Sequence, residues 1–169
     1  MAGCHIHAIG GGYATFSGEQ NKICGRESGS ACPGTHYTSE VAAAYAHRAD
    51  TPSQLWSGML DRVRTNLDLL GYAMLFFPEQ HPLLAQILKD KCANGLRVRI
   101  SLADPDSAEV MARDELEGLS GTLPGRILST VRHFEPLFSD AGVEIRYHSV
   151  PLYNALYRFD DQIDRKSVV

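Results

Sequence analysis

The stretch His81–Pro105, HPLLAQILKDKCANGLRVRISLADP, decides the fold because it joins a helix to a strand with a clear boundary between them. Its first part places apolar side chains at helical spacing, and Asn94-Gly95 is a suitable C-terminal stop. The following LRVRISLADP alternates arginine with aliphatic residues before a loop that starts at Asp104, which is typical of a strand. We therefore predict a helix followed by a strand, one unit of an α/β fold.

The residues before this unit predict another helix and another strand. Thr51 is a candidate N-cap and Pro52 suits the first helical position, and apolar residues then recur at helical spacing up to about Thr65. The run Leu67–Phe77 is nearly all apolar and ends at Pro78, which is typical of a central strand covered on both faces.

The residues after Pro105 continue the alternation. The expected elements are a helix capped by Ser107 and running to about Glu117, a break at GTLPG, a helix over Arg126–Ala141, and the strands VEIRYHSV and LYNALYRFDD. A strand, helix, strand, helix, strand series predicts an α/β fold with a mainly parallel sheet flanked by helices. Ligands of such sheets collect at the carboxyl ends of the strands.

Composition and charge exclude several classes of function. The 169 residues are 44% hydrophobic and 21% charged, which is near the average for one soluble domain with a real core. A formal net charge of -4 argues against a general electrostatic grip on nucleic acid, which needs a basic face. No apolar run approaches the roughly 20 residues of a membrane span, and the N-terminal sequence lacks the features of a signal peptide. We therefore expect a cytoplasmic protein.

The first 38 residues differ in composition from the rest of the chain. They contain eight of the fifteen glycines and three of the four cysteines, without a sustained helical or strand period. We predict a poorly ordered leader over residues 1–38, a domain over residues 39–162, and a tail over residues 163–169 that lacks strand alternation. The abrupt end of this tail also fits a truncated domain.

The leader holds residue types that bind metals, but their spacing matches no familiar zinc pattern. These residues are Cys4, His5, His7, Cys24, Cys32 and His36. Without a secretory signal we expect reduced cysteines, and Cys92, at an apolar helical position, is expected to be a buried thiol. We predict no metal site and no cofactor.

Three stretches of the sequence together resemble a known family. They are LLGYAMLFFPEQHP at residues 69–82, RVRISLADPDSAEV at 97–110 and LYNALYRFDD at 152–161. The chain resembles the single-repeat form of the phospholipase D-like fold and, more narrowly, a domain of actinobacterial helix-turn-helix transcriptional regulators of the XRE type. The resemblance covers residues 39–162 and implies that DNA is bound by a separate helix-turn-helix domain, which is not visible in these residues. It also implies a homodimer, because active members of the superfamily pair two repeats about one site.

The resemblance also indicates where a catalytic site would lie. In active members a histidine attacks phosphorus, a lysine two residues later binds the phosphate, and an aspartate seven residues after the histidine orients it. Aligned on Asp160, this chain has Tyr153 at the histidine position and Ala155 at the lysine position. Alignment on Asp161 also leaves both positions without a histidine or a lysine. We therefore predict no catalytic residues.

Polar residues near the carboxyl ends of the predicted strands form the candidate ligand site. By strand alternation Asn154, Arg158 and Asp160 share one face, and His148 and Asp104 follow neighbouring strands. The candidate ligand-binding residues are Asn154, Arg158, Asp160, His148, Asp104 and Tyr153.

Structural roles are the alternative for these residues. His148 can cap its strand through a backbone hydrogen bond, and Asp104 can form a turn and helix cap. Arg158 can pair with Asp160 on a solvated face of the sheet.

We expect a non-catalytic, phospholipase D-like domain that senses a small, phosphorylated molecule and dimerises within a transcriptional regulator. One alternative is a phosphodiesterase or nuclease that uses Tyr153 and His148, because a tyrosine can attack phosphorus when a base or cation ionises it. A ligand-free protein interaction module is the other alternative.

Overall fold

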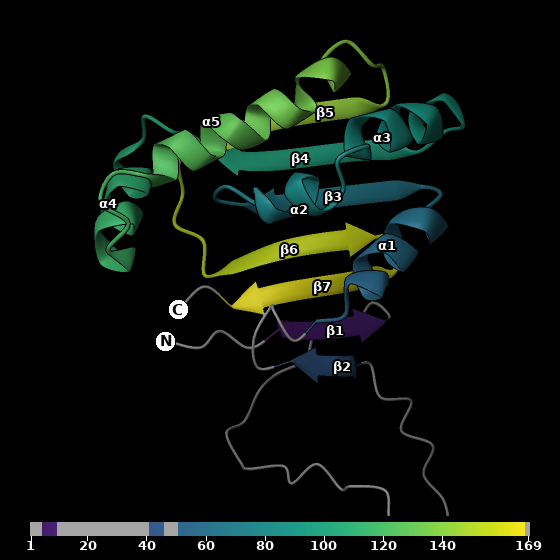
Figure 1. Ribbon diagram of the computed structural model, residues 1–169, viewed down its shortest axis with the longest axis horizontal. Helices are drawn as coiled ribbons and strands as arrows, with labels where there is room; N and C mark the ends of the chain where they lie inside the picture. Colours follow the sequence, from purple (N-terminus) through teal and green to yellow (C-terminus); the bar gives the residue numbers. More distant parts are fainter. Residues whose placement is uncertain (1–4, 10–40, 46–50, 168–169) are drawn as a thin grey trace, which may run out of the picture.

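The computed structural model describes residues 5–9, 41–45 and 51–167. The strands are β1 (His5–Ile9), β2 (Val41–Tyr45), β3 (Asn66–Gly71), β4 (Arg97–Ala103), β5 (Val143–His148), β6 (Asn154–Phe159) and β7 (Gln162–Ser167). The helices are α1 (Ser53–Arg62), α2 (Phe76–Gln80), α3 (Leu84–Ala93), α4 (Ala108–Glu117), α5 (Leu123–Phe134) and the 3-10 turn η2 (Glu135–Leu137) (Figure 1). Within these described ranges, no helix combines the length and the apolar composition that crossing a membrane requires.

All seven strands belong to one mixed sheet in the order β2-β1-β7-β6-β3-β4-β5. Strands β3, β4 and β5 are parallel to one another, as the βαβ pattern predicted. The pairs β3–β6, β6–β7, β7–β1 and β1–β2 are antiparallel, so the prediction of a mainly parallel sheet is wrong. Part of the reason is the short connection after β5: with no crossover helix, β6 starts at the same end of the sheet at which β5 finishes and must run in the opposite direction. The tight turn between β6 and β7 then makes that pair antiparallel as well.

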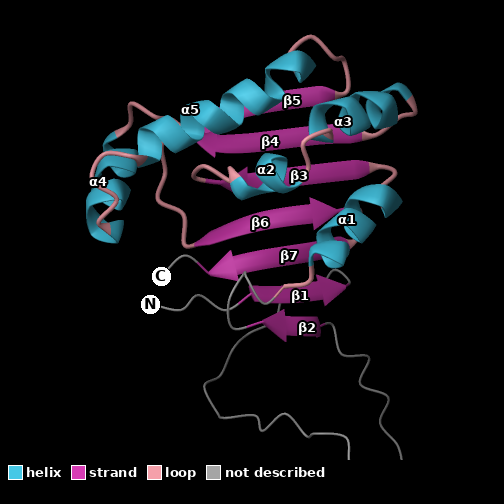
Figure 2. Cartoon of the chain, viewed as in Figure 1, coloured by secondary structure: helices cyan, strands magenta, loops and turns pink. Residues whose placement is uncertain are grey.

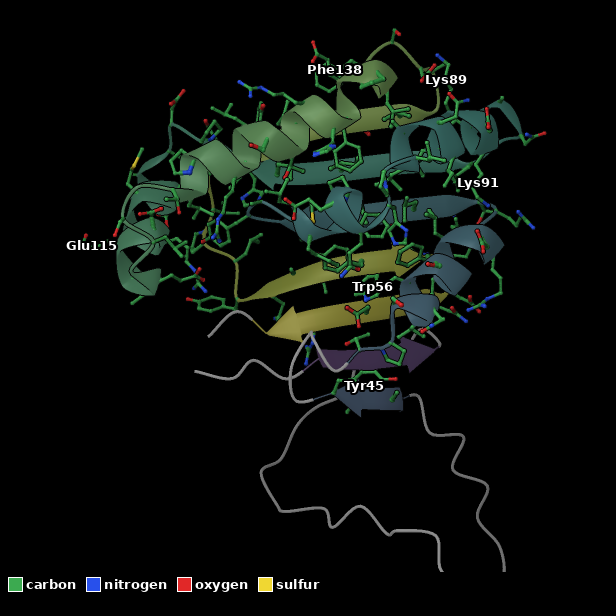
Figure 3. The ribbon with its side chains drawn as sticks, in the orientation of Figure 1. Tyr45, Trp56, Lys89, Lys91, Glu115 and Phe138 are labelled. Carbon is green, nitrogen blue, oxygen red and sulfur yellow. The ribbon has the colours of Figure 1, made fainter. Side chains whose placement is uncertain are left out.

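The helices α1, α2, α3 and α5 lie on one face of this sheet (Figure 2). Burial along β3 alternates accordingly, with Leu67 and Leu69 buried and Asp68 partly exposed on the other face. The centre of the core is Trp56 of α1, which projects toward the sheet and meets the Tyr157 ring of β6 edge-on at a centroid distance of 5.2 Å (Figure 3). The expectation that β3 would be covered on both faces is therefore wrong for the described residues.

The predicted strand over Leu67–Phe77 is about half as long as expected. Strand β3 ends at Gly71, and Met74 adopts a positive φ of 54° that turns the chain back over the sheet. A Cβ at position 71 would lie 2.7 Å from Met74 Cγ, so this close return requires glycine. The last apolar residues of the run enter the short helix α2, which contains Pro78.

Most predicted helices are present, with shifted ends. Thr51 does not cap α1, whose N-cap is Pro52 without a side-chain hydrogen bond. Helix α5 begins at Leu123, inside the expected break, and ends at Phe134 rather than near residue 141, because Pro136 cannot continue an α-helix.

Both ends of the folded unit lie beyond the predicted limits. The tail forms strand β7, so the expectation of an irregular tail is wrong, and residues 5–9 of the expected leader form β1 beside it. Residues 1–4 and 10–38 of that leader lie outside the described residues. They include Cys4, Cys24, Cys32 and His36. Cys92 is a free, half-buried thiol, and burial raises its pKa together with the neighbouring charge of Asp140.

Candidate functional site

A cavity of about 470 Å³ lies on the helix-covered face of the sheet, between the end of β3 and the start of β6. Its size is within the range of small-molecule sites. The lining residues come from the turn after β3, from α2, α4, α5 and from β6. They are Tyr72, Ala73, Met74, Leu75, Phe76, Glu79, Arg113, Glu117, Leu123, Arg126, Ala155 and Tyr157. The cavity therefore gathers residues that are far apart in the sequence at one edge of the sheet.

Arg113 is the most enclosed charge of this cavity. Its side chain is only 12% exposed, and its guanidinium carbon lies 5.7 Å from the centroid of the Tyr72 ring, which is within cation–π range. Its Nε donates to Glu117 Oε1 over 2.7 Å, one helical turn later on α4. Ser107 fixes the start of this helix by accepting a hydrogen bond from the backbone N–H of Val110 over 3.3 Å.

Arg126 reaches the same cavity because Asp114 holds the start of α5 against α4. The carboxylate of Asp114 is buried and accepts hydrogen bonds from the backbone N–H groups of Gly121 and Leu123. It therefore satisfies donors at the N-terminal end of α5 and sets the position from which Arg126 projects. Asp114 therefore belongs to the buried side of α4, although its neighbours along the chain are charged.

One lining residue of the cavity is Ala155, which the alignment proposed from the sequence sets at the lysine position of the superfamily. Ala155 is 8% exposed and offers no charge. Tyr153, at the histidine position, is not among the lining residues and is 77% exposed. Among the described residues, no histidine and no lysine lines the cavity, so its two cations are arginines from helices rather than a lysine from the strand.

The six predicted ligand-binding residues do not converge on one point. Asn154 and Asp160 lie at opposite ends of β6, which six residues at 3.3 Å each separate by about 20 Å. Arg158 lies between them on the face that the helices leave open. Tyr153, His148 and Asp104 lie near the Asn154 end.

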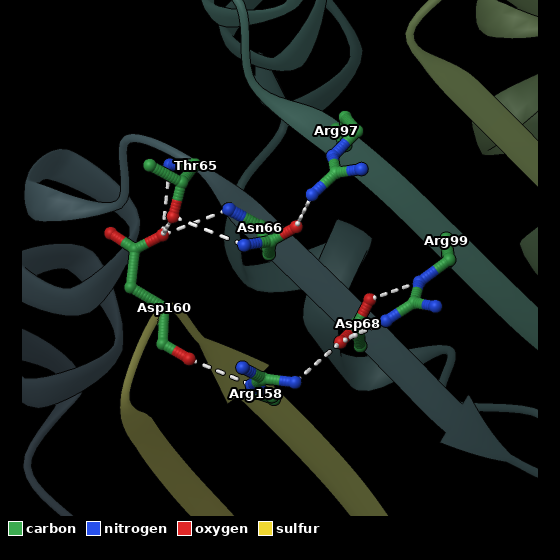
Figure 4. A network of polar contacts seen from close by, with 7 residues as sticks. All are labelled: Thr65, Asn66, Asp68, Arg97, Arg99, Arg158 and Asp160. Atoms are coloured by element: carbon green, nitrogen blue, oxygen red, sulfur yellow. Dashed lines mark hydrogen bonds and ion pairs between the residues drawn. The ribbon is translucent and has the colours of Figure 1, made fainter.

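Asp160 has a structural role at the edge far from the cavity. Its carboxylate accepts hydrogen bonds from the backbone N–H groups of Arg64, Thr65 and Asn66, each over 2.8 Å, and from Thr65 Oγ1 over 2.6 Å. Figure 4 shows the contacts with Thr65 and Asn66. Burial alone would raise the pKa of this carboxyl group, but these hydrogen bonds outweigh it and lower the pKa to about 2. Through these hydrogen bonds the carboxylate connects the turn between α1 and β3 to the end of β6.

Arg158 does not pair with the Asp160 carboxylate. Its Nε donates to the backbone oxygen of Asp160 over 2.7 Å, and its Nη1 lies 3.4 Å from Asp68 Oδ2. Asp68 is also held by two hydrogen bonds from Arg99, over 2.7 and 2.8 Å (Figure 4). Arg158 therefore lies on a solvated face of the sheet and pairs with a side chain of the neighbouring strand. The sequence did not indicate this partner.

His148 and Asp104 have the local contacts of turn and strand-end residues. His148 Nε2 lies 3.4 Å from the backbone oxygen of Gly71, and its ring meets the Tyr72 ring edge-on. Asp104 Oδ1 accepts from the Asp106 N–H over 3.1 Å, and its backbone oxygen accepts from Ser107 Oγ over 2.8 Å. The turn-and-cap interpretation of this segment is confirmed.

Arg113 and Arg126 are the residues that sequence reasoning missed. No local signal separates them from other helix-surface arginines, because only the packing of α4 against α5 and the cavity that both share with the turn after β3 and with β6 bring them together. No family model matches this chain, and no curated protein is significantly similar to it.

Proposed function

We propose that this chain is a non-catalytic, phospholipase D-like sensing and dimerising domain of a transcriptional regulator. In this proposal a small anionic molecule binds in the cavity beside Arg113 and Arg126, and a separate helix-turn-helix domain contacts DNA. The single observation that carries the ligand part is the pair of arginines in a cavity that is also lined by Ala155, the residue aligned with the superfamily's phosphate-binding lysine.

The charges of the cavity favour a phosphorylated sugar or a nucleotide over a simple anion. The two arginines can bind phosphate oxygens through their planar donor groups. Glu79 and Glu117 also line the cavity, and their carboxylates can accept hydrogen bonds from sugar hydroxyls. A ligand that carries both kinds of group would satisfy both pairs of side chains.

Among the described lining residues, the cavity lacks the histidine and the lysine of the superfamily's phosphodiesterases, which supports binding without chemistry. Ala155 cannot hold phosphate, and Tyr153 is exposed outside the cavity. Phosphoryl transfer through a covalent intermediate needs a nucleophile next to a base or a cation. The described lining residues offer tyrosine hydroxyls and carboxylates, but no histidine that could act as nucleophile.

A thermal-shift screen of the full chain tests this proposal. Nucleotides, phosphosugars and inorganic phosphate are added separately, and a ligand at 100 times its dissociation constant stabilises the fold by about 2.7 kcal/mol. For a chain of this length we expect the melting temperature to rise by about 5–10 °C. The shift should vanish in Arg113→Ala and Arg126→Ala.

Two matched variants locate the site. Arg132→Ala removes an exposed arginine of α5 that does not line the cavity, and Arg158→Ala removes the predicted ligand residue on the face of the sheet that the helices do not cover. Both should keep the shift. A shift lost only in Arg158→Ala would move the ligand to the other face of the sheet. No shift with any compound would favour a ligand-free interaction module.

A further inference from the structure

The face of the sheet opposite the helices carries charged side chains in a regular order. We call it the open face, because no helix of the described residues covers it (Figure 2). A hollow of about 570 Å³ lies on it, bordered by side chains of β3, β4, β5, β6 and β7. The side chains of Arg99, Arg158 and Glu144 are 60%, 45% and 45% exposed, so their charged groups are accessible to a partner although each forms an ion pair within its own chain.

Strand register places four charges of alternating sign in one row across the open face. Glu144 of β5 is opposite Arg99 of β4, Arg99 is opposite Asp68 of β3, and Asp68 is opposite Arg158 of β6. From β5 to β6 the row therefore reads negative, positive, negative, positive. Figure 4 shows the inner part of this row, where Asp68 lies between Arg99 and Arg158.

This order of charges is complementary to itself: when the open faces of two copies meet about a two-fold axis, opposite charges face each other. An axis that runs along the strands, between β3 and β4, reverses the order of the row in the second copy. Glu144 then faces Arg158 of the second copy, and Arg99 faces Asp68 of the second copy. Each pair occurs twice, so all eight charges of the two rows meet the opposite sign.

A two-fold axis shifted to either neighbouring strand would bring like charges of the two copies together. An axis along β3 brings Arg99 against Arg158 of the second copy, and an axis along β4 brings Glu144 against Asp68 of the second copy. Like charges in direct contact oppose association, so the row selects one register of the two sheets.

The next row supplies contacts without repulsion. It consists of Arg146, Ser101, Leu70 and Leu156, again in strand order from β5 to β6. The same axis brings Leu70 against Ser101 of the second copy and the stem of Arg146 against Leu156 of the second copy. The charge of Arg146 is offset within its own chain, where it forms an ion pair with Glu144. Aligned sheets pack about 10 Å apart, a distance that side chains of this length can fill.

From this symmetry we propose that the open face is the homodimer interface, with Glu144 and Asp68 of each copy paired to Arg158 and Arg99 of the other. The inference rests on the dimerising part of the proposed function and assigns it a surface on the face opposite the cavity, so the two copies do not share one site as the paired repeats of active members do. Four facing strands of six residues cover about 19 by 20 Å, or about 400 Å² of each copy. That is roughly half the area of a standard interface, so the dimer is weak and depends on concentration and on salt.

The experiment measures the mass of the full chain by sedimentation velocity from about 5 to 500 µM in low salt. The wild-type chain is expected to dimerise over this range. Glu144→Arg and Arg158→Glu each place like charges in both outer pairs, and each is expected to weaken the dimer about tenfold or more. Arg132→Glu reverses an exposed charge on the helix-covered side and should have no effect.

Mixing the two variants gives the decisive measurement. In a mixed dimer the arginine introduced by Glu144→Arg in one copy meets the glutamate introduced by Arg158→Glu in the other. The second outer pair joins the native Arg158 to the native Glu144, so both outer pairs have opposite signs again. Within one chain residues 144 and 158 are three strand spacings apart, about 14 Å, so recovery cannot come from a contact inside the chain. Circular dichroism of each variant verifies that the fold is retained.

Three outcomes would overturn the inference: a wild-type chain that stays monomeric at every concentration, a dimer that ignores both charge reversals, or a mixture that does not associate better than its components. A dimer that ignores both reversals would leave the dimerising function in place and assign it to another surface. The thermal-shift result for the cavity is independent of all three.

Discussion

Replacing Asp160 by asparagine removes the carboxylate that connects the end of β6 to the start of β3 while leaving the backbone in place. Residue 160 has a φ of 54°, in the left-handed region that asparagine adopts readily. The asparagine amide has only one oxygen, and its NH2 group meets backbone donors where the carboxylate accepted hydrogen bonds. The change therefore tests the charge and the acceptors of this side chain.

The pKa of Asp160 gives the size of the effect. A value of about 2 instead of 3.8 corresponds to about 2.4 kcal/mol, at 1.36 kcal/mol for each pKa unit. Asp160 is partly exposed, and solvent weakens such interactions. We therefore expect Asp160→Asn to lower the free energy of unfolding by about 1–2 kcal/mol at pH 7.

The loss should depend on pH in a defined direction. Because folding lowers the pKa of this carboxyl group, its stabilisation is present above about pH 4 and is lost as the pH falls toward 2. Urea unfolding followed by circular dichroism at pH 7 and pH 3 should show the difference between wild type and Asp160→Asn shrinking by about half. Asp161→Asn, which changes the exposed neighbour, should have little effect at either pH.

Two results would refute this reasoning. One is a difference in unfolding free energy that is the same at pH 7 and pH 3, since the charge of Asp160 would then not matter. The other is an equal effect of Asp161→Asn, since the hydrogen bonds to Asp160 would then not be the cause.

Three further predictions concern stability and use the same urea assay. Ser107→Ala removes the side-chain cap of α4 and should cost about 1 kcal/mol, whereas retained stability would show that the 3.3 Å contact contributes nothing. Gly142→Ala should cost about 1–3 kcal/mol because its Cβ would lie 2.9 Å from a backbone oxygen, while Gly125→Ala, with no atom within 4 Å, should stabilise α5 by about 0.5–1 kcal/mol. Trp56→Ala should cost about 3–5 kcal/mol, because this 2% exposed ring packs against four others, and a smaller loss would mean that the core can collapse around the gap.

The sequence by itself determined the elements whose signals are local. The stop at Asn94-Gly95, the Ser107 cap and the alternation of arginine with aliphatic residues through β4 each involve residues only a few positions apart. Such signals act within one turn or one strand, so the helices α3 and α4 and the strand β4 could be predicted without knowing their neighbours.

Only the tertiary structure decided where those elements lie and which side chains meet. Strand β6 looks the same in sequence whether it runs parallel or antiparallel; the short connection after β5 sets its direction, and tertiary packing places it beside β3. That pairing sends Ala155 to the cavity and Arg158 to the open face, and it carries Asp160 to donors 94 to 96 positions earlier in the chain. Arg113 and Arg126 become neighbours of Tyr72 for the same reason: contacts between distant segments depend on packing, which no local pattern encodes.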